Sequence, residues 1–143
     1  GWDARVDERL VDVAALQLVA SPEQFDLIAT TNLFGDILSD LACHWSGGLG
    51  TAPSLNWGDG IALAEPVHGS APDIAGAGIA NPIGTILSAA MLLEYSAGES
   101  VGARKISTAV EAVLQAGFAT PDLGGKHTTQ QMTDEVIRQV RRI

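Results

Sequence analysis

Cysteine, basic residues and long apolar runs are all scarce in this chain of 143 residues. Its one cysteine, Cys43, rules out an internal disulfide framework and fits a reducing compartment. Eight basic residues stand against seventeen acidic ones, so no basic stripe is present that would bind the phosphate backbone of a nucleic acid. No stretch approaches the roughly 18–20 apolar residues of a membrane span. These shortages predict a soluble, cytoplasmic protein that binds neither nucleic acid nor membrane.

Aromatic residues are also few, whereas glycine and alanine are abundant. The apolar share of 46% and the charged share of 17% are typical of a globular domain, and the length is sufficient for a sizeable core. Small residues favour close packing of helices on strands and let the backbone approach a ligand closely. The net charge of −9 suits a divalent cation without specifying one.

Apolar spacing divides the chain into helices and strands. Helices are predicted over residues 7–20, over a segment that carries Asp36 and Asp40 and ends at Gly47, and over residues 81–98, 101–116 and 129–142. Strands are predicted over residues 25–31, 49–56 and 60–67, the last two joined by the turn WGDG. Asn81 is the expected N-cap of one helix, and Thr128 with Gln131 forms the capping box of another. This alternation predicts an α/β fold.

Three aspartates occupy helical positions that are unusual for a carboxylate. Asp36 and Asp40 are four residues apart, and like charges at that spacing destabilise a helix. Asp12 lies on the first helix, which is apolar on nearly all sides and is therefore expected in a core or a subunit interface. Burying a carboxylate there costs several kcal/mol unless it is paired or bound to a metal. Three aspartates without clustered histidine or cysteine predict an all-oxygen site for Mg²⁺ or Mn²⁺.

The same three residues also allow a reading without metal. In that alternative Asp36 caps the start of its helix, Asp40 faces water, and Asp12 pairs with Arg9 or Arg5. The spacing of the residues does not decide between the two readings.

A glycine-rich loop, HGSAPDIAGAGIANP, follows the last predicted strand. Its backbone can approach a ligand and offer N–H groups to an anion or a ribose, but it matches neither GxGxxG nor the Walker pattern. His68 is placed to stack on or hydrogen-bond to a ring, and Asp73 to accept hydrogen bonds from a ribose diol. An acidic residue there would repel a 2′-phosphate, which favours NAD over NADP. The alternative is a surface turn with a capping aspartate.

Two motifs in this order resemble the β-decarboxylating dehydrogenase family, which includes isopropylmalate, isocitrate, homoisocitrate and tartrate/malate dehydrogenases. They are NLFGDILSD with the following GGLG, and EPVHGSAPDIAG with IANP. The resemblance covers essentially the whole chain and implies an isopropylmalate-dehydrogenase-like α/β fold. It further implies a C-terminal portion of a two-domain enzyme, with residues 1–47 ending a small dimerisation domain and residues 48–143 belonging to the nucleotide-binding domain.

The resemblance also implies the roles of individual residues. Asp36 and Asp40 of one subunit would hold Mg²⁺ or Mn²⁺ together with Asp12 of the partner in a homodimer. Eight residues would line the adenosine end of an NAD site: His68, Gly69, Ser70, Ala71, Pro72, Asp73, Ile74 and Asn81. The catalytic tyrosine and lysine of the family lie N-terminal to the matching region, so no catalytic residue is expected here and the chain alone is expected to be inactive.

The function implied is that of an oxidoreductase: metal-dependent oxidative decarboxylation of a 2-hydroxy acid of the 3-isopropylmalate type, with NAD as hydride acceptor. Two alternatives remain. One is a non-catalytic regulatory or partner subunit of the same family that keeps the dimer surface and the nucleotide loop. The other is a structural domain in which the carboxylates are incidental.

Overall fold

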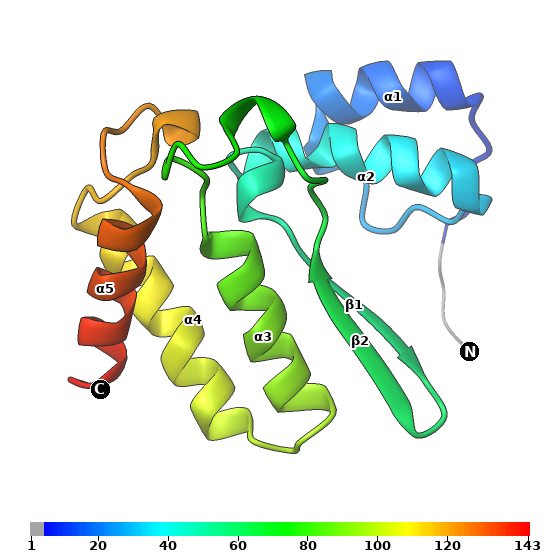
Figure 1. Ribbon diagram of the computed structural model, residues 1–143. Helices are drawn as coiled ribbons and strands as arrows, with labels where there is room; N and C mark the ends of the chain where they lie inside the picture. Colours follow the sequence, from blue (N-terminus) through cyan, green and yellow to red (C-terminus); the bar gives the residue numbers. More distant parts are fainter. Residues whose placement is uncertain (1–4) are drawn as a thin grey trace. The chain divides into compact units, whose positions relative to one another are not determined.

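The computed structural model describes residues 5–143 (Figure 1). The chain divides into two compact units, with the boundary between Trp45 and Ser46. The first unit is helical, and the second combines a β-hairpin with three helices. Within the described residues, every helix is too short or too polar to cross a bilayer.

The first unit contains helices α1 (Val11–Ala20) and α2 (Asn32–Ser46) and a short 3₁₀ turn, η1 (Pro22–Gln24). The indole Nε1 of Trp45 donates a hydrogen bond to the carbonyl oxygen of Leu18 at 3.0 Å and so ties the end of α2 to α1. As predicted, α2 ends immediately before Gly47, which has a φ of 102°.

One prediction for this unit is wrong. Residues 25–31 form no strand, because a strand needs a partner for its backbone groups and none lies beside them among the described residues. The first helix was predicted to lie in a core or a subunit interface. Within this chain only Ala14 and Leu18 of α1 are buried and Leu16 is 71% exposed, so the chain forms no core around it and the subunit interface stays a prediction. The apolar surface predicted for α1 is therefore present, and in the single chain it is exposed.

The second unit is built on an antiparallel hairpin of β1 (Pro53–Gly58) and β2 (Ile61–Pro66), paired in register from Pro53↔Pro66 to Gly58↔Ile61. The turn is Asp59-Gly60, and Gly60 takes the left-handed φ of 74° that such a turn requires. Both predicted strands are thus confirmed. The first begins at residue 53, later than expected, because Leu49–Thr51 forms the 3₁₀ turn η2.

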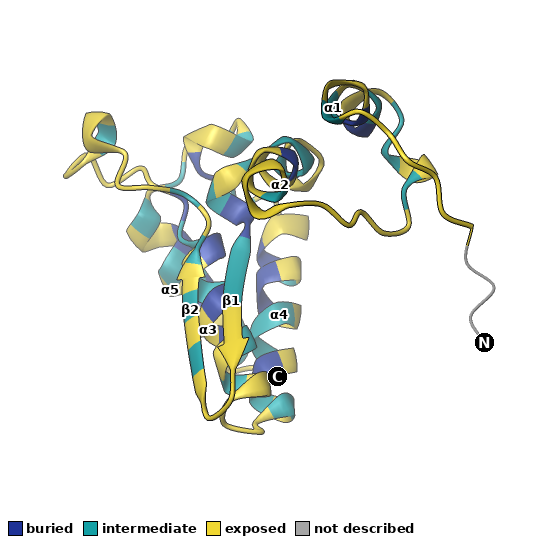
Figure 2. Ribbon diagram, turned by 90° about the vertical axis from the view of Figure 1, so that its right-hand side faces the viewer, coloured by how far each residue is buried: buried dark blue, intermediate teal, exposed yellow. Residues whose placement is uncertain are grey.

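Helices α3 (Ile83–Tyr95), α4 (Ser100–Gln115) and α5 (Thr129–Val140) lie side by side, and α3 packs against both strands. The Ser88 hydroxyl, 1% exposed, donates to the Glu65 carbonyl oxygen at 2.9 Å and accepts from the Ser54 N–H at 3.2 Å. Figure 2 shows the buried residues gathered on the facing sides of these elements. The core cluster is Ile83, Ala109, Val110, Val113, Met132 and Val136.

The helix starts follow the predicted signals. The Asn81 side-chain oxygen accepts the Ile83 N–H at 3.0 Å, as expected of a capping residue, although α3 begins at Ile83 and Pro82 is the residue immediately before it. Thr128 and Gln131 form the complete capping box at the start of α5. Two further 3₁₀ turns, η3 (Pro72–Ile74) and η4 (Pro121–Leu123), lie in the loops before α3 and α5. The loop before α3 carries the predicted nucleotide-binding residues, and the loop before α5 carries Asp122, which hydrogen-bonds to Asn81.

Candidate metal and nucleotide sites

Asp36 and Asp40 lie one turn apart on α2, so their side chains leave the helix on the same face. Both residues are exposed. The Asn32 amide donates to Asp36 Oδ2 at 3.4 Å, and among residues 5–143 neither carboxylate forms an ion pair. The repulsion between them is therefore not offset by a cationic side chain in the described part of the chain.

The negative charge of Asp40 also acts on Cys43, one turn further along α2. Burial, and after it the charge of Asp40, raises the pKa of the Cys43 thiol above its usual value. A thiol with a raised pKa stays protonated at neutral pH and is a poor nucleophile. This shift is opposite to the one that activates a catalytic cysteine.

Asp12 is exposed on the first turn of α1, where its carboxylate accepts the Val13 N–H at 2.9 Å. It pairs with neither nearby arginine, because Arg5 pairs with Asp7 at 3.3 Å and Arg9 is held elsewhere. The Arg9 guanidinium contacts Gln17, Gln24 and the ring of Phe25. The alternative in which Asp12 pairs with Arg5 or Arg9 is therefore wrong.

Of the other two parts of that alternative, one is wrong and one is confirmed. Asp36 does not cap its helix, because α2 begins four residues earlier, at Asn32. Asp40 does face water, as the alternative expects. In residues 5–143, no three histidine, cysteine, aspartate or glutamate side chains come together as a metal site. Two oxygen donors on one face of α2 fit part of a hard-cation site, which needs a third ligand from outside this group.

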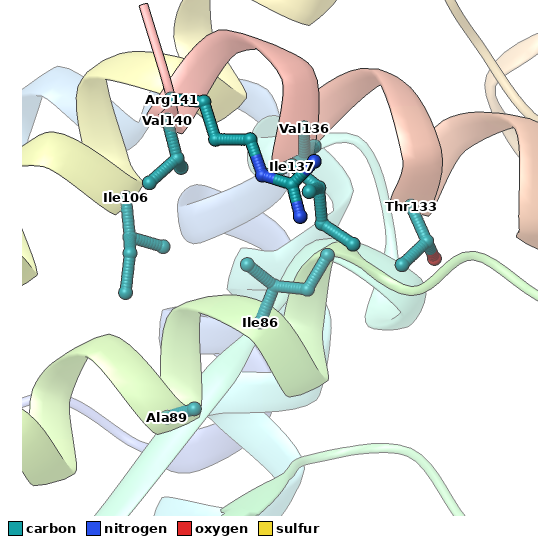
Figure 3. A pocket seen from close by; sticks show the side chains of 8 residues that line it. All are labelled: Ile86, Ala89, Ile106, Thr133, Val136, Ile137, Val140 and Arg141. Carbon is teal, nitrogen blue, oxygen red and sulfur yellow. The ribbon is translucent and has the colours of Figure 1, made fainter. Parts of the chain in front are cut away.

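A groove of about 350 Å³ lies between α3, α4 and α5 (Figure 3). Ile86 from α3 and Ile137 from α5 point toward one another across it, and Thr133 and Arg141 are its only polar side chains. None of the predicted site residues lines this groove. Its apolar walls do not suit a dinucleotide, which carries a charged diphosphate, so the nucleotide candidates lie elsewhere.

The predicted nucleotide residues lie in one loop between β2 and α3, in which Gly69, Ser70, Ala71, Pro72 and Asp73 are exposed, His68 and Ile74 are half-buried and Asn81 is buried. The His68 ring nitrogen Nδ1 lies 2.9 Å from the Gly69 carbonyl oxygen, and Asp73 is exposed on η3. Ala71 has φ 41° and ψ 63° and is the only residue other than glycine with a positive φ among residues 5–143. Strain of this kind persists only where surrounding structure enforces it, and it gathers at ligand sites.

Asn81 differs from the other nucleotide candidates because its side chain is used within the chain. The residue is 7% exposed. Its oxygen caps α3 through Ile83, and its amide nitrogen donates to Asp122 Oδ2 at 3.0 Å. These two hydrogen bonds let the Asn81 side chain fix the end of the loop.

The profile described as isocitrate/isopropylmalate dehydrogenase matches residues 2–136. The isocitrate/homoisocitrate dehydrogenase of Thermus thermophilus is 57% identical over 136 residues. The chain belongs to the isocitrate/isopropylmalate dehydrogenase family.

Other members of the isocitrate/isopropylmalate dehydrogenase family agree with this assignment. The 3-isopropylmalate dehydrogenase of Lactococcus lactis is 52% identical over 137 residues. Each match covers 95% of this chain, which spans about 40% of the length of these curated relatives. The crystal structure of isocitrate dehydrogenase from Methylococcus capsulatus superposes with a TM-score of 0.88 at 49% identity, covering 93% of this chain and 40% of that one. The predicted family and fold class are confirmed.

Two residues that support the predicted nucleotide loop were not predicted from the sequence. Thr129, at the start of α5, donates its backbone N–H to the Gly78 carbonyl oxygen at 2.9 Å and its hydroxyl to the Ala80 carbonyl oxygen. Asp122 receives the Asn81 amide. No local pattern indicates contacts that span 41 and 49 residues along the chain.

Proposed function

We propose that this chain carries the metal-binding and adenosine-binding parts of an NAD-dependent enzyme that oxidises and decarboxylates a 2-hydroxy acid of the 3-isopropylmalate type. The observation that carries the proposal is the pair of exposed aspartates on α2, one turn apart and without a cationic partner in residues 5–143. A divalent cation bound by both carboxylates would offset the repulsion between them, and the family assignment supports such a site.

In this proposal Asp36 and Asp40 hold Mg²⁺ or Mn²⁺, and Asp12 of a second copy completes the ligand set in a homodimer. The open apolar surface of α1 supports a subunit contact there, because Leu10 and Leu16 are more than two-thirds exposed. When bound, the divalent ion supplies electrostatic stabilisation of the negative charge that develops on the substrate oxygens. The carboxylates fix its position.

The loop between β2 and α3 would receive the adenosine half of NAD. Asp73 accepts hydrogen bonds from the two ribose hydroxyls, and the backbone around the strained Ala71 approaches the nucleotide closely. None of these groups transfers a proton in the proposed reaction. We therefore expect the 143-residue chain alone to bind its ligands without turnover.

The substrate is proposed only as a class. The relatives above are named for isocitrate, homoisocitrate and 3-isopropylmalate, and their identities to this chain lie within a few per cent of one another. The shared chemistry of these compounds is a 2-hydroxy acid with a further carboxylate. That class is what the proposal assigns.

The charge of Asp73 makes a first prediction. We expect the chain to bind NAD⁺ about tenfold more tightly than NADP⁺ in calorimetric titration, because the carboxylate repels the 2′-phosphate. The substitution Asp73→Asn should remove most of that difference by strengthening NADP⁺ binding. Asp59→Asn, which removes an exposed carboxylate from the hairpin turn, is the matched control and should leave the preference unchanged. An equal preference in D73N and the unaltered chain would exclude this role.

A further inference from the structure

The end of the nucleotide loop is held by a residue nearly fifty positions away. Thr129 binds two carbonyl groups of the loop at once, one at Gly78 through its backbone N–H and one at Ala80 through its hydroxyl. A single residue thereby fixes three consecutive loop residues against the first turn of α5. The Asn81–Asp122 hydrogen bond adds a third point of attachment directly after them.

The segment that makes these contacts is itself firmly anchored. The Gly125 N–H donates to the Thr120 carbonyl oxygen, and the His127 N–H to the Ala119 carbonyl oxygen, both at 3.0 Å. The His127 ring stacks on Phe118 with centroids 4.5 Å apart. Immediately after it, the capping box fixes the start of α5, whose Met132 is completely buried. Thr129 thus connects the loop to the core of the second unit.

At the β2 end of the loop, the Val67 N–H donates to the Ala52 carbonyl oxygen at 3.2 Å. Between His68 and Ala77, the hydrogen bonds of the described structure join residues no more than three positions apart, such as that from the Ile74 N–H to the Ala71 carbonyl oxygen. The conformation of the exposed part of the loop therefore depends on how its two ends are held. One end is attached to β2, and the other is residues 78–80, which Thr129 holds by hydrogen bonds. Fixing a binding loop before the ligand arrives lowers the entropy cost of binding.

We propose that Thr129 is a positioning residue for the nucleotide, which holds residues 78–80 in the conformation that receives the adenosine end of NAD. The inference rests on the proposed function, in that the loop must bind NAD. It goes beyond that proposal because Thr129 acts through the Gly78 and Ala80 carbonyls and need not touch the ligand.

The test compares three substitutions in the full chain by calorimetric titration with NAD⁺ and by amide hydrogen exchange of residues 76–80. Thr129→Val keeps the shape and the backbone N–H but removes the hydroxyl, whereas Thr129→Ser restores it. Thr133→Val is the control, since the Thr133 hydroxyl donates only to the Thr129 carbonyl oxygen, one turn back in the same helix.

We expect T129V to weaken NAD⁺ binding about tenfold and to speed loop exchange, while T129S and T133V resemble the unaltered chain. A T129V variant that binds NAD⁺ normally would overturn the positioning role. If the unaltered chain binds no NAD⁺, the proposed function fails and the nucleotide role of Thr129 fails with it. Exchange that is equally slow in T129V would separately show that the hydroxyl does not hold the loop.

Discussion

Replacing Gly125 with alanine should lower the free energy of unfolding by about 3 kcal/mol. A Cβ at this position would lie 2.0 Å from the carbonyl oxygen of Ala119 and 2.4 Å from its carbonyl carbon. Neither partner moves easily, because the Ala119 oxygen accepts the His127 N–H and Gly125 donates to Thr120. The clash would have to be relieved by opening this turn, and with it the segment that leads to Thr129.

Gly102 provides the matched control for this substitution. It lies in the first turns of α4, and an added Cβ there meets no atom within 4 Å. Gly102→Ala should therefore raise stability by up to about 1 kcal/mol, as expected for this change inside a helix. Urea unfolding followed by circular dichroism measures both variants. A G125A variant as stable as the unaltered chain would contradict the close approach of Gly125 to Ala119.

The second large effect is expected from mixing two defective chains. If Asp12 serves the metal of a partner, a chain with Asp12→Asn keeps Asp36 and Asp40, while a chain with Asp36→Asn and Asp40→Asn keeps Asp12. Each variant alone should show no stabilisation by Mn²⁺. The mixture should recover it, because a heterodimer contains one complete site.

The size of this effect follows from binding linkage. At an Mn²⁺ concentration one hundred times the Kd, a complete site adds about 2.7 kcal/mol to stability. Thermal unfolding of each variant and of the mixture, with and without Mn²⁺, measures it. A mixture that responds no more than its components would contradict a shared site, whereas a normal response in D12N alone would exclude Asp12 as a ligand.

The elements that the sequence predicted well have local causes. The Asp59-Gly60 turn, the Asn81 cap and the Thr128–Gln131 capping box each depend on residues within a few positions of one another, and all three are present. Residues 25–31 have the apolar composition of a strand but do not form one. A strand forms only beside a partner strand, and the sequence of a short segment does not show whether such a partner is available.

In the candidate sites, too, the features that depend on nearby residues were predictable and those that depend on distant segments were not. The spacing of Asp36 and Asp40 places them on one helix face without any tertiary information. The support from Asp122 and Thr129 depends on how distant segments meet, so no inspection of the loop alone would find it. The lack of an ion pair at Asp12 could not be predicted from the sequence either, because it depends on Arg9 being directed to Gln17, Gln24 and Phe25.

Whether Asp36 and Asp40 hold a divalent cation is tested most directly by the melting temperature of the chain and of its Asp36→Asn, Asp40→Asn variant, each with and without Mn²⁺. We predict that Mn²⁺ raises the melting temperature of the unaltered chain and leaves that of the variant unchanged. Without metal, the variant should melt higher than the unaltered chain, because the repulsion between the two carboxylates is gone. An unaltered chain that does not respond to Mn²⁺, or a variant that responds equally, would contradict a metal site on α2.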